Sequence, residues 1–391
     1  MKITAIRTFV VNAEMRNWVF VRVETDVPGL YGWGEATLEW KTRAVVGAIE
    51  DLEPLLLGHD PRDISRTVTR LVKHGFWPPG VIGMTAISGI EHALWDILGK
   101  SLGQPVWRLL GGRVRDKVKV YTHLGLGDMR AVYETMEPEP LADRAAELVA
   151  AGYEAFKVVF IPYTHFSTTS RALRHVGTLM RKLREAVGPG VDVMVDFHGR
   201  CGSPKVALQF IRELEPYEPL FVEEPIQPGD LESMRIITEQ AGCPVASGER
   251  LVGLAEFEPL FHARAINIAQ PDLNHCGGLL TAQGIAAAAA SANIGIAPHN
   301  PNGPLAGAAA LHFAVATQNH VIQEVMEKTV PWQDDVVAAT PIRRTGGFWS
   351  LPEAPGLGFE VNEAEAAKHK FKQEVFHTEH AVLPDGTLVD W

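Results

Sequence analysis

The sequence is poor in cysteine and lacks both strongly basic segments and long apolar runs. Its 391 residues contain three cysteines, Cys201, Cys243 and Cys276. An odd number of widely spaced cysteines argues against a disulfide framework or a zinc cluster, and it fits a reducing compartment. No apolar run reaches the roughly 20 residues of a membrane span, and no signal-peptide core stands near the amino terminus. We therefore expect a cytoplasmic protein without a membrane partner.

Charge and motif content argue against two further classes of protein. The formal net charge is −11 and no basic run offsets it, so we expect no nucleic-acid partner. No GxGxxG follows the first strand of the alternating region, which argues against a dinucleotide-binding fold. The composition is otherwise that of a globular protein, with 46% hydrophobic and 21% charged residues, and it allows a large core.

Two regions with different patterns follow one another along the chain. Residues 1–116 form an α+β unit, with strand-like stretches at 3–11, 18–24 and 29–35 and helical patterns at 42–57, 64–73 and 85–102. From residue 117 on, strand and helix patterns alternate. The candidate strands are 118–124, 155–160, 191–198, 219–224, 244–249, 266–271, 294–299 and 321–325.

This alternation indicates βαβ units and a parallel sheet, and eight strands favour a closed barrel over an open sheet. We therefore predict an α/β fold, a modified TIM-type (β/α)8 barrel at 117–344 with an α+β capping domain at 1–116. The loop-rich tail, 345–391, is expected to pack back on the capping domain.

Three of the predicted strands end in carboxylates. Asp196, Glu223 and Glu249 follow apolar runs on three consecutive strands, and in parallel barrels such ends meet at one face. Ligands that offer only oxygen favour Mg²⁺, with Mn²⁺ as a substitute, over zinc. Without a cation these acids would repel one another and take up protons. The sequence thus predicts a magnesium site, with Glu224 as a weaker ligand candidate.

Other strand ends also carry ionisable groups, namely Lys157, His198, Asp272, His299 and Glu324. If the third strand extends to His198, alternation places its imidazole on the same face as Asp196. Asp272 can orient His299 and raise its basicity, as a general base requires. His275 competes for that role but falls past its strand. Burial near other acids should favour the protonated form of Glu324, making it a hydrogen-bond donor, although an internal salt bridge is an alternative.

Each of these residues, taken singly, has a structural explanation as a helix cap, a surface acid or a satisfied histidine. A set of ionisable groups at seven of eight strand ends is much harder to explain in that way. We therefore interpret the set as one site.

With these residues, the sequence resembles the mandelate-racemase-like subgroup of the enolase superfamily, and most closely the D-galactonate dehydratase family. The motifs that carry the resemblance are Gly32-Trp33-Gly34-Glu35, Asp196-Phe197-His198-Gly199-Arg200, Glu223-Glu224-Pro225, Gly248-Glu249-Arg250, Gln270-Pro271-Asp272-Leu273 and Ala297-Pro298-His299. The Asp-x-His at 196–198 is the specific part, since many relatives carry Asp-x-Asn there.

The resemblance implies a Mg²⁺-dependent dehydratase of a sugar acid, such as D-galactonate, that yields a 2-keto-3-deoxy acid. His299, oriented by Asp272, would take the C2 proton, and His198 would protonate the leaving C3 hydroxyl. Mg²⁺ and Glu324 would stabilise the charge on the substrate carboxylate. Which histidine is the base follows from the resemblance alone.

Three further positions are expected to contact the substrate, namely Asn17, Lys157 and Tyr163. Asn17 is equally well explained as a turn cap. Val159 occupies the second position of a Lys-x-Lys pair that some relatives use as a base, and this counts against racemisation. A cycloisomerase or epimerase, or a non-catalytic family member, remain the alternatives, and the resemblance implies a homo-oligomer.

Overall fold

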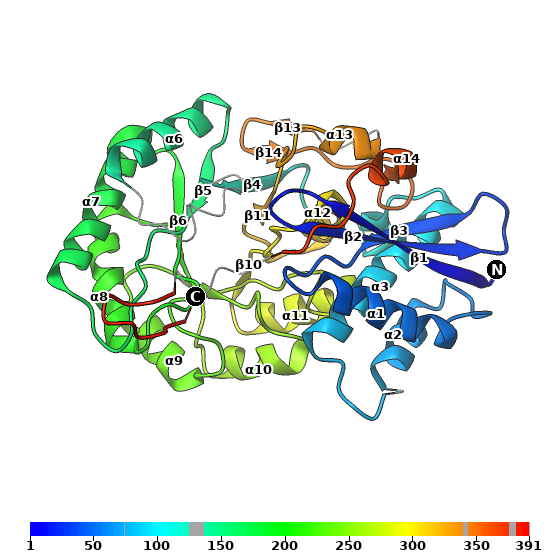
Figure 1. The fold of residues 1–391 in the computed structure, drawn as a ribbon, viewed down its shortest axis with the longest axis horizontal. Coiled ribbons are helices and arrows are strands. Elements are labelled where there is room, and N and C mark those ends of the chain that lie inside the picture. The colour runs from blue at the N-terminus through cyan, green and yellow to red at the C-terminus, as the bar shows by residue number, and fades with distance from the viewer. Residues whose placement is uncertain (74, 125–136, 339–342, 375–380, 391) are drawn as a thin grey trace.

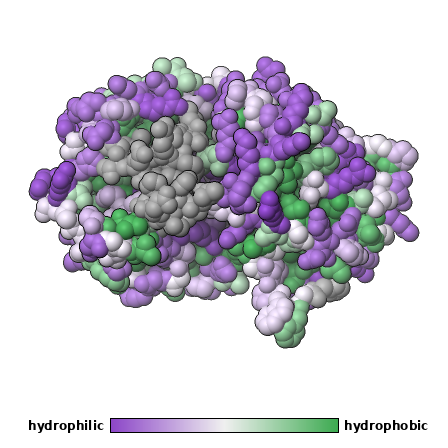
Figure 2. All heavy atoms as spheres, in the orientation of Figure 1, coloured by the Kyte–Doolittle hydropathy of each residue, from purple (hydrophilic) through white to green (hydrophobic). Residues whose placement is uncertain are grey.

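The computed structural model describes residues 1–73, 75–124, 137–338, 343–374 and 381–390. Figure 1 shows two parts side by side, a barrel of alternating strands and helices and a smaller part that carries the amino terminus. On the face shown in Figure 2, hydrophilic residues predominate and apolar residues lie scattered among them. Such a distribution is normal for a soluble domain.

The smaller part is a three-stranded antiparallel meander covered by helices. Strands β1 (Ile3–Asn12), β2 (Asn17–Thr25) and β3 (Tyr31–Glu35) pair in that order. They are followed by helices α1 (Thr42–Leu52), η1 (Glu53–Leu55), α2 (Ile64–Lys73), α3 (Gly80–Leu102) and α4 (Val106–Leu109). These elements agree with the α+β pattern of the sequence.

Helix α3 lies directly on β3 because two glycines allow the close approach. A Cβ on Gly32 would lie 2.0 Å from the carbonyl oxygen of Ala93, and one on Gly34 would lie 2.0 Å from that of Gly89. α3 is also long and apolar enough to cross a membrane, but 78% of its most apolar window is buried inside the protein. That burial is typical of the core helix of a soluble protein.

The larger part is a closed barrel of eight parallel strands. They are β4 (Val118–His123), β5 (Ala155–Val158), β6 (Asp192–Asp196), β7 (Val222–Glu223), β8 (Val245–Ser247), β9 (Ile268–Ala269), β10 (Gly295–Ile296) and β11 (Gln323–Glu324). The strands pair in chain order from β4 to β10, and β11 pairs with β4. A parallel bridge between Ile296 and His320 joins β10 to the segment before β11 and closes the ring. The predicted barrel is confirmed.

Helices connect successive strands and cover the outside of the barrel (Figure 1). They are α6 (Pro138–Ala150), α7 (Ser170–Val187), α8 (Pro204–Leu214), α9 (Leu231–Gln240), α10 (Leu254–His262), α11 (Gly278–Ser291) and α12 (Pro304–Ala316), with η2 (Glu215–Tyr217) after α8. Side chains cap the start of three of them, since Thr169 caps α7, Ser203 caps α8 and Asp230 caps α9.

The interior of the barrel is filled by one apolar residue from each strand or from the residue next to it. These residues are Tyr121, Ala155, Met194, Phe221, Ala246, Ile268, Ala297 and Ile322. Side chains on a strand alternate between its two faces, so the residue two positions on points the same way. This apolar layer therefore forms the floor beneath the next layer toward the carboxyl ends of the strands.

The carboxyl-terminal region contacts both parts. β13 (Arg344–Thr345) and β14 (Phe348–Trp349) form a hairpin, and β14 pairs antiparallel with β4 of the barrel. After α13 (Gln333–Val336), β12 (Val337–Ala338) pairs with β15 (Glu360–Val361), which α14 (Glu363–Ala366) follows. The same region also contacts the capping domain, since Trp107 Nε1 donates to Pro352 O, Leu357 N donates to Asp96 Oδ1 and Asn12 N donates to His369 O.

Candidate active site and metal centre

A layer of polar residues lies directly above the apolar floor of the barrel. Counting two residues on from each floor position gives His123, Lys157, Asp196, Glu223, Gly248, Gln270, His299 and Glu324. Where that position is Gly248, the next residue, Glu249, supplies the ionisable group. The structure thus brings together in this layer six of the residues predicted from strand ends and adds His123 and Gln270 to them.

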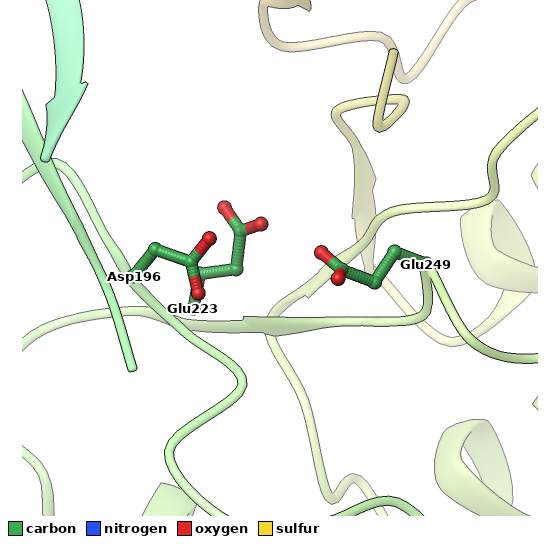
Figure 3. A group of neighbouring side chains, drawn as sticks. All are labelled: Asp196, Glu223 and Glu249. Atoms are coloured by element: carbon green, nitrogen blue, oxygen red, sulfur yellow. The ribbon is translucent and has the colours of Figure 1, made fainter. Parts of the chain in front are cut away.

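The three carboxylates predicted to bind a metal converge on one point (Figure 3). One oxygen from each of Asp196, Glu223 and Glu249 lies within 4.8 Å of the others. Asp196 and Glu223 end β6 and β7, while Glu249 follows β8 after Gly248, whose φ of 141° turns the chain. The carboxylates come from three adjacent strands, so the sheet holds them together before anything binds.

Electrostatics at this point favour a cation. Burial and the Asp196 charge raise the pKa of Glu223 well above its usual range. Burial, Glu224 and Asp196 likewise raise the pKa of Glu249. The buried Glu223 Oε2 has no hydrogen-bond partner among the described residues. Converging carboxylate oxygens that resist ionisation fit a hard divalent ion such as Mg²⁺.

Lys157 is the counter-charge that the protein itself supplies. Its buried ammonium Nζ lies 2.6 Å from Glu223 Oε1, 3.0 Å from Glu324 Oε1 and 3.5 Å from Asp196 Oδ2. Burial lowers its pKa, but the Glu223 and Glu324 charges outweigh this and raise the pKa of Lys157 well above its usual range. Lys157 therefore stays charged and connects the metal-binding acids to Glu324.

The expectation of a protonated Glu324 is wrong. Glu324 Oε2 accepts from Asn300 N at 2.8 Å, and Oε1 faces Lys157 and His123 Nε2, the latter at 3.2 Å. Burial raises the pKa of Glu324, but Lys157 and the hydrogen bond from His123 outweigh it and hold the pKa well below its usual range. Its neighbours are donors rather than acids, and this favours the ionised form. The internal salt bridge considered as the alternative is present.

His299 and Asp272 form the predicted pair. They lie three residues past β10 and β9, and His299 Nδ1 is 2.8 Å from Asp272 Oδ2. Burial lowers the pKa of His299, but the Asp272 bond and the Glu324 charge raise it to about 9. The other ring nitrogen, Nε2, points toward the metal-binding acids, 3.6 Å from Glu249 Oε2.

Asp272 is itself held by its surroundings. Asn302 Nδ2 donates to the same Oδ2 at 2.8 Å, and Asn274 N donates to Oδ1 at 2.7 Å. The competing histidine, His275, has its Nε2 3.5 Å from Asp272 Oδ2 and its Nδ1 3.0 Å from Thr85 Oγ1 of the capping domain. Asp272 is thus closer to His299, while His275 faces the capping domain.

His198 reaches the site by a turn and not by strand alternation. β6 ends at Asp196, and His198 has a φ of 50°, so the predicted strand to His198 is wrong. His198 N donates to Asp196 Oδ1 at 2.9 Å, and its Nε2 lies 3.0 Å from Asp196 Oδ2. This contact and Lys157 outweigh the effect of burial and hold the pKa of Asp196 well below its usual range.

Two of the three expected substrate contacts lie against residues outside the carboxylate cluster. Asn17 is buried, and its amide exchanges hydrogen bonds with the backbone of Lys372 in the tail. Tyr163 lies beneath the Arg200 guanidinium, 4.5 Å from its ring centroid. Of the three, only Lys157 contacts the carboxylate cluster.

A link between the two domains was also missed from the sequence. Glu35, at the end of β3, accepts hydrogen bonds from the backbone N–H groups of Gly303, Leu305 and Ala306 at the start of α12. Glu91 of α3 does the same for Leu279 and Leu280 at the start of α11. Helix N-termini favour carboxylates, but the sequence does not show which acids reach across a domain boundary.

Two protein-family models match the chain. Residues 3–111 match the mandelate racemase/muconate lactonizing enzyme N-terminal domain, and residues 140–365 match the enolase C-terminal domain-like family. The first match falls on the capping domain and the second on the barrel.

Solved structures with the same fold cover nearly the whole chain. A mandelate racemase/muconate lactonizing enzyme from Sulfitobacter sp. is 35% identical, with 96% of this chain and 97% of that one covered and a TM-score of 0.87. One from Jannaschia sp. CCS1 is 34% identical, with 96% and 100% covered and a TM-score of 0.87.

An enolase from Agrobacterium radiobacter, described as a candidate galactarate dehydratase and bound to Na and L-malate, is 30% identical. It is covered in full by this chain and covers it in full, with a TM-score of 0.90. From the two domain matches and these relatives, we conclude that the chain belongs to the mandelate racemase/muconate lactonizing enzyme family of the enolase superfamily.

Proposed function

We propose that the protein is a Mg²⁺-dependent acid sugar dehydratase, which removes the C2 proton and the C3 hydroxyl of an aldonate such as D-galactonate. The observation that carries this proposal is the position of the His299–Asp272 pair and of His198 on opposite sides of the three-carboxylate cluster. β6 and β10 are four strands apart in a ring of eight, so the two imidazoles come from opposite sides. The neighbour described as a candidate galactarate dehydratase supports the same reaction class.

Asp196, Glu223 and Glu249 would hold the ion. When bound, Mg²⁺ supplies Lewis-acid stabilisation of the negative charge that develops on the substrate carboxylate as the C2 proton leaves. The remaining steps belong to the side chains of the chain itself.

Lys157 provides the second positive charge for the carboxylate. Its ammonium lies among the acids at the floor of the site and is held by Glu324 Oε1 at 3.0 Å. In this proposal Glu324 acts as the fixed partner of Lys157. A buried, preoriented cation at the position where negative charge develops lowers the barrier to proton removal.

His299 is the general base. Asp272 fixes its Nδ1–H, so the Nε2 lone pair points toward the carboxylate cluster, where C2 of a bound acid would lie. As Nε2 takes the C2 proton, the electron pair of that C–H bond first delocalises onto the substrate carboxylate. It then forms the C2–C3 double bond as the C3–O bond breaks.

His198 is the general acid. Its Nε2, now beside Asp196 Oδ2, would give a proton to the departing C3 hydroxyl, which leaves as water. The resulting enol tautomerises to the 2-keto-3-deoxy acid, and the overall reaction is loss of one water with no redox change.

A panel of aldonates and aldarates, incubated with Mg²⁺-loaded protein in D2O, tests the proposal. Formation of a 2-keto-3-deoxy product from at least one acid is expected, and the variant His299→Asn should abolish it. Exchange at C2 without loss of water would indicate the epimerase alternative. If folded, metal-loaded protein formed no product from any acid in the panel, the proposal would be refuted.

A further inference from the structure

The polar layer of the barrel contains a third imidazole that the proposed reaction has not used. His123 ends β4 and stands in register with Lys157 on β5. It lies two residues past Tyr121 of the apolar floor, so its side chain points toward the same end of the barrel as the catalytic groups.

Burial separates the side chains of the site into two groups. The side chains of Asp196, Lys157 and Glu324 are 1% exposed or less. Those of His123, His198 and His299 keep 18%, 15% and 14% of their surface exposed. His123 therefore lies at the open side of the site with the two proposed acid–base residues.

The contact that His123 makes is specific. Its Nε2 lies 3.2 Å from Glu324 Oε1, the same oxygen that Lys157 Nζ contacts at 3.0 Å. Asn300 N holds the other oxygen at 2.8 Å. Glu324 Oε1 thus lies against groups from β4 and β5, while a backbone N–H from the loop after β10 bonds Oε2. Of the two side chains at Oε1, His123 is the one that can contact it without a fixed charge.

We propose that His123 is a positioning residue that holds Glu324, and through it the Lys157 ammonium, in the geometry needed for proton removal at C2. The inference rests on the proposed function and extends it to a residue outside the expected catalytic set. Without the His123 hydrogen bond, Glu324 Oε1 could rotate away from Lys157. The ammonium would then be drawn toward Glu223, which lies 2.6 Å away, and away from the substrate carboxylate.

The test compares His123→Met with His123→Gln. Met fills a similar volume without an N–H, whereas the Gln side-chain amide can donate from nearly the position of Nε2. We expect His123→Met to lower kcat and the C2 exchange rate about ten- to a hundredfold, the effect of losing one hydrogen bond to a charged group, with KM within about twofold. His123→Gln should recover most of the rate. His262→Met, on the exposed end of α10, should behave as wild type.

A double variant tests whether the loss of rate in His123→Met depends on Glu324. In a Glu324→Gln background the further change His123→Met should cost less than about threefold in the C2 exchange rate, because the partner charge is already gone. Thermal unfolding of each variant checks that the fold is intact.

Three outcomes would overturn the inference while the wild type remains active. These are an unchanged rate in His123→Met, equal losses in the Met and Gln variants, or a rise in KM at constant kcat. A wild type that neither exchanges the C2 proton nor forms product would instead refute the proposed function, and the inference would fall with it.

Discussion

Replacing Glu35 by Gln should change both the pH dependence of stability and the catalytic rate, because this carboxylate joins the two domains at the catalytic loop. Glu35 is fully buried and accepts from three N–H groups at residues 303–306 and from Thr37 Oγ1. The same loop carries His299, Asn300 and Asn302. A change at Glu35 therefore affects the position of the proposed base, His299, although the two side chains are not in contact.

The magnitude follows from the pKa of Glu35. Burial raises it from 4.5 to about 6, although the hydrogen bonds oppose this. A shift of about 1.5 units corresponds to about 2 kcal/mol. Because the folded state binds the proton more tightly than the unfolded state, this stability is present below pH 4.5 and is lost as the pH rises through about 6. The amide introduced by Glu35→Gln does not titrate, so the variant lacks this dependence.

Urea denaturation of both proteins from pH 4.5 to pH 7 measures the effect. The stability advantage of the wild type over Glu35→Gln should be about 2 kcal/mol larger at pH 4.5 than at pH 7. All other titrating groups, including Glu91, whose pKa burial raises to about 7, occur in both proteins and cancel in this difference. At pH 7 the variant should also show a reduced kcat.

The control is Glu258→Gln, a change of an exposed acid on α10. It should show no pH-dependent difference from the wild type. A stability difference between Glu35→Gln and wild type that stays constant over this pH range would refute the reasoning about the buried charge. An unchanged kcat would refute its role in holding the catalytic loop.

Three further perturbations probe the site. Lys157→Met leaves buried acids without their counter-charge, so the metal-free variant should unfold at a lower Tm than the wild type. Mg²⁺ should raise the Tm of the variant by more than it raises that of the wild type, and equal shifts in both proteins would contradict this. Asp272→Asn removes the bond that helps to raise the pKa of His299 to about 9, so the acid limb of the pH profile of kcat/KM should move toward pH 6.5. The maximum of kcat/KM should fall at least about a hundredfold, and an unmoved acid limb would argue against His299 as the base. Glu223→Gln should weaken Mg²⁺ binding at least about tenfold in calorimetric titration, whereas Glu258→Gln should not; equal affinities would remove Glu223 from the metal site.

Residues placed by periodicity could be predicted from the sequence. Asp196, Glu223 and Glu249 end consecutive apolar runs, and the rule that parallel strands gather their carboxyl ends at one face sufficed to bring them together. Asp272 and His299 followed from the same rule. His123 satisfies it too, and counting two residues past Tyr121 would have found it.

What depends on backbone turns or on long side chains could not be predicted. Histidine adopts a left-handed φ more often than most residues, but the sequence does not show that His198 is at such a turn. In the structure His198 N donates to Asp196 Oδ1 across it. The ionised state of Glu324 depends on where the flexible Lys157 side chain places its ammonium, a distance that no sequence pattern encodes. The contact of Glu35 with α12 joins residues 268 positions apart.

The central claim is that three strand-end carboxylates hold a divalent cation beside His299. Crystals soaked in Mn²⁺ would test it most directly, through anomalous diffraction recorded at the manganese edge. We predict one strong peak between Asp196, Glu223 and Glu249, about 2.1 Å from an oxygen of each, and its loss in Glu223→Gln. No peak there, or a peak of equal height in the variant, would contradict the account.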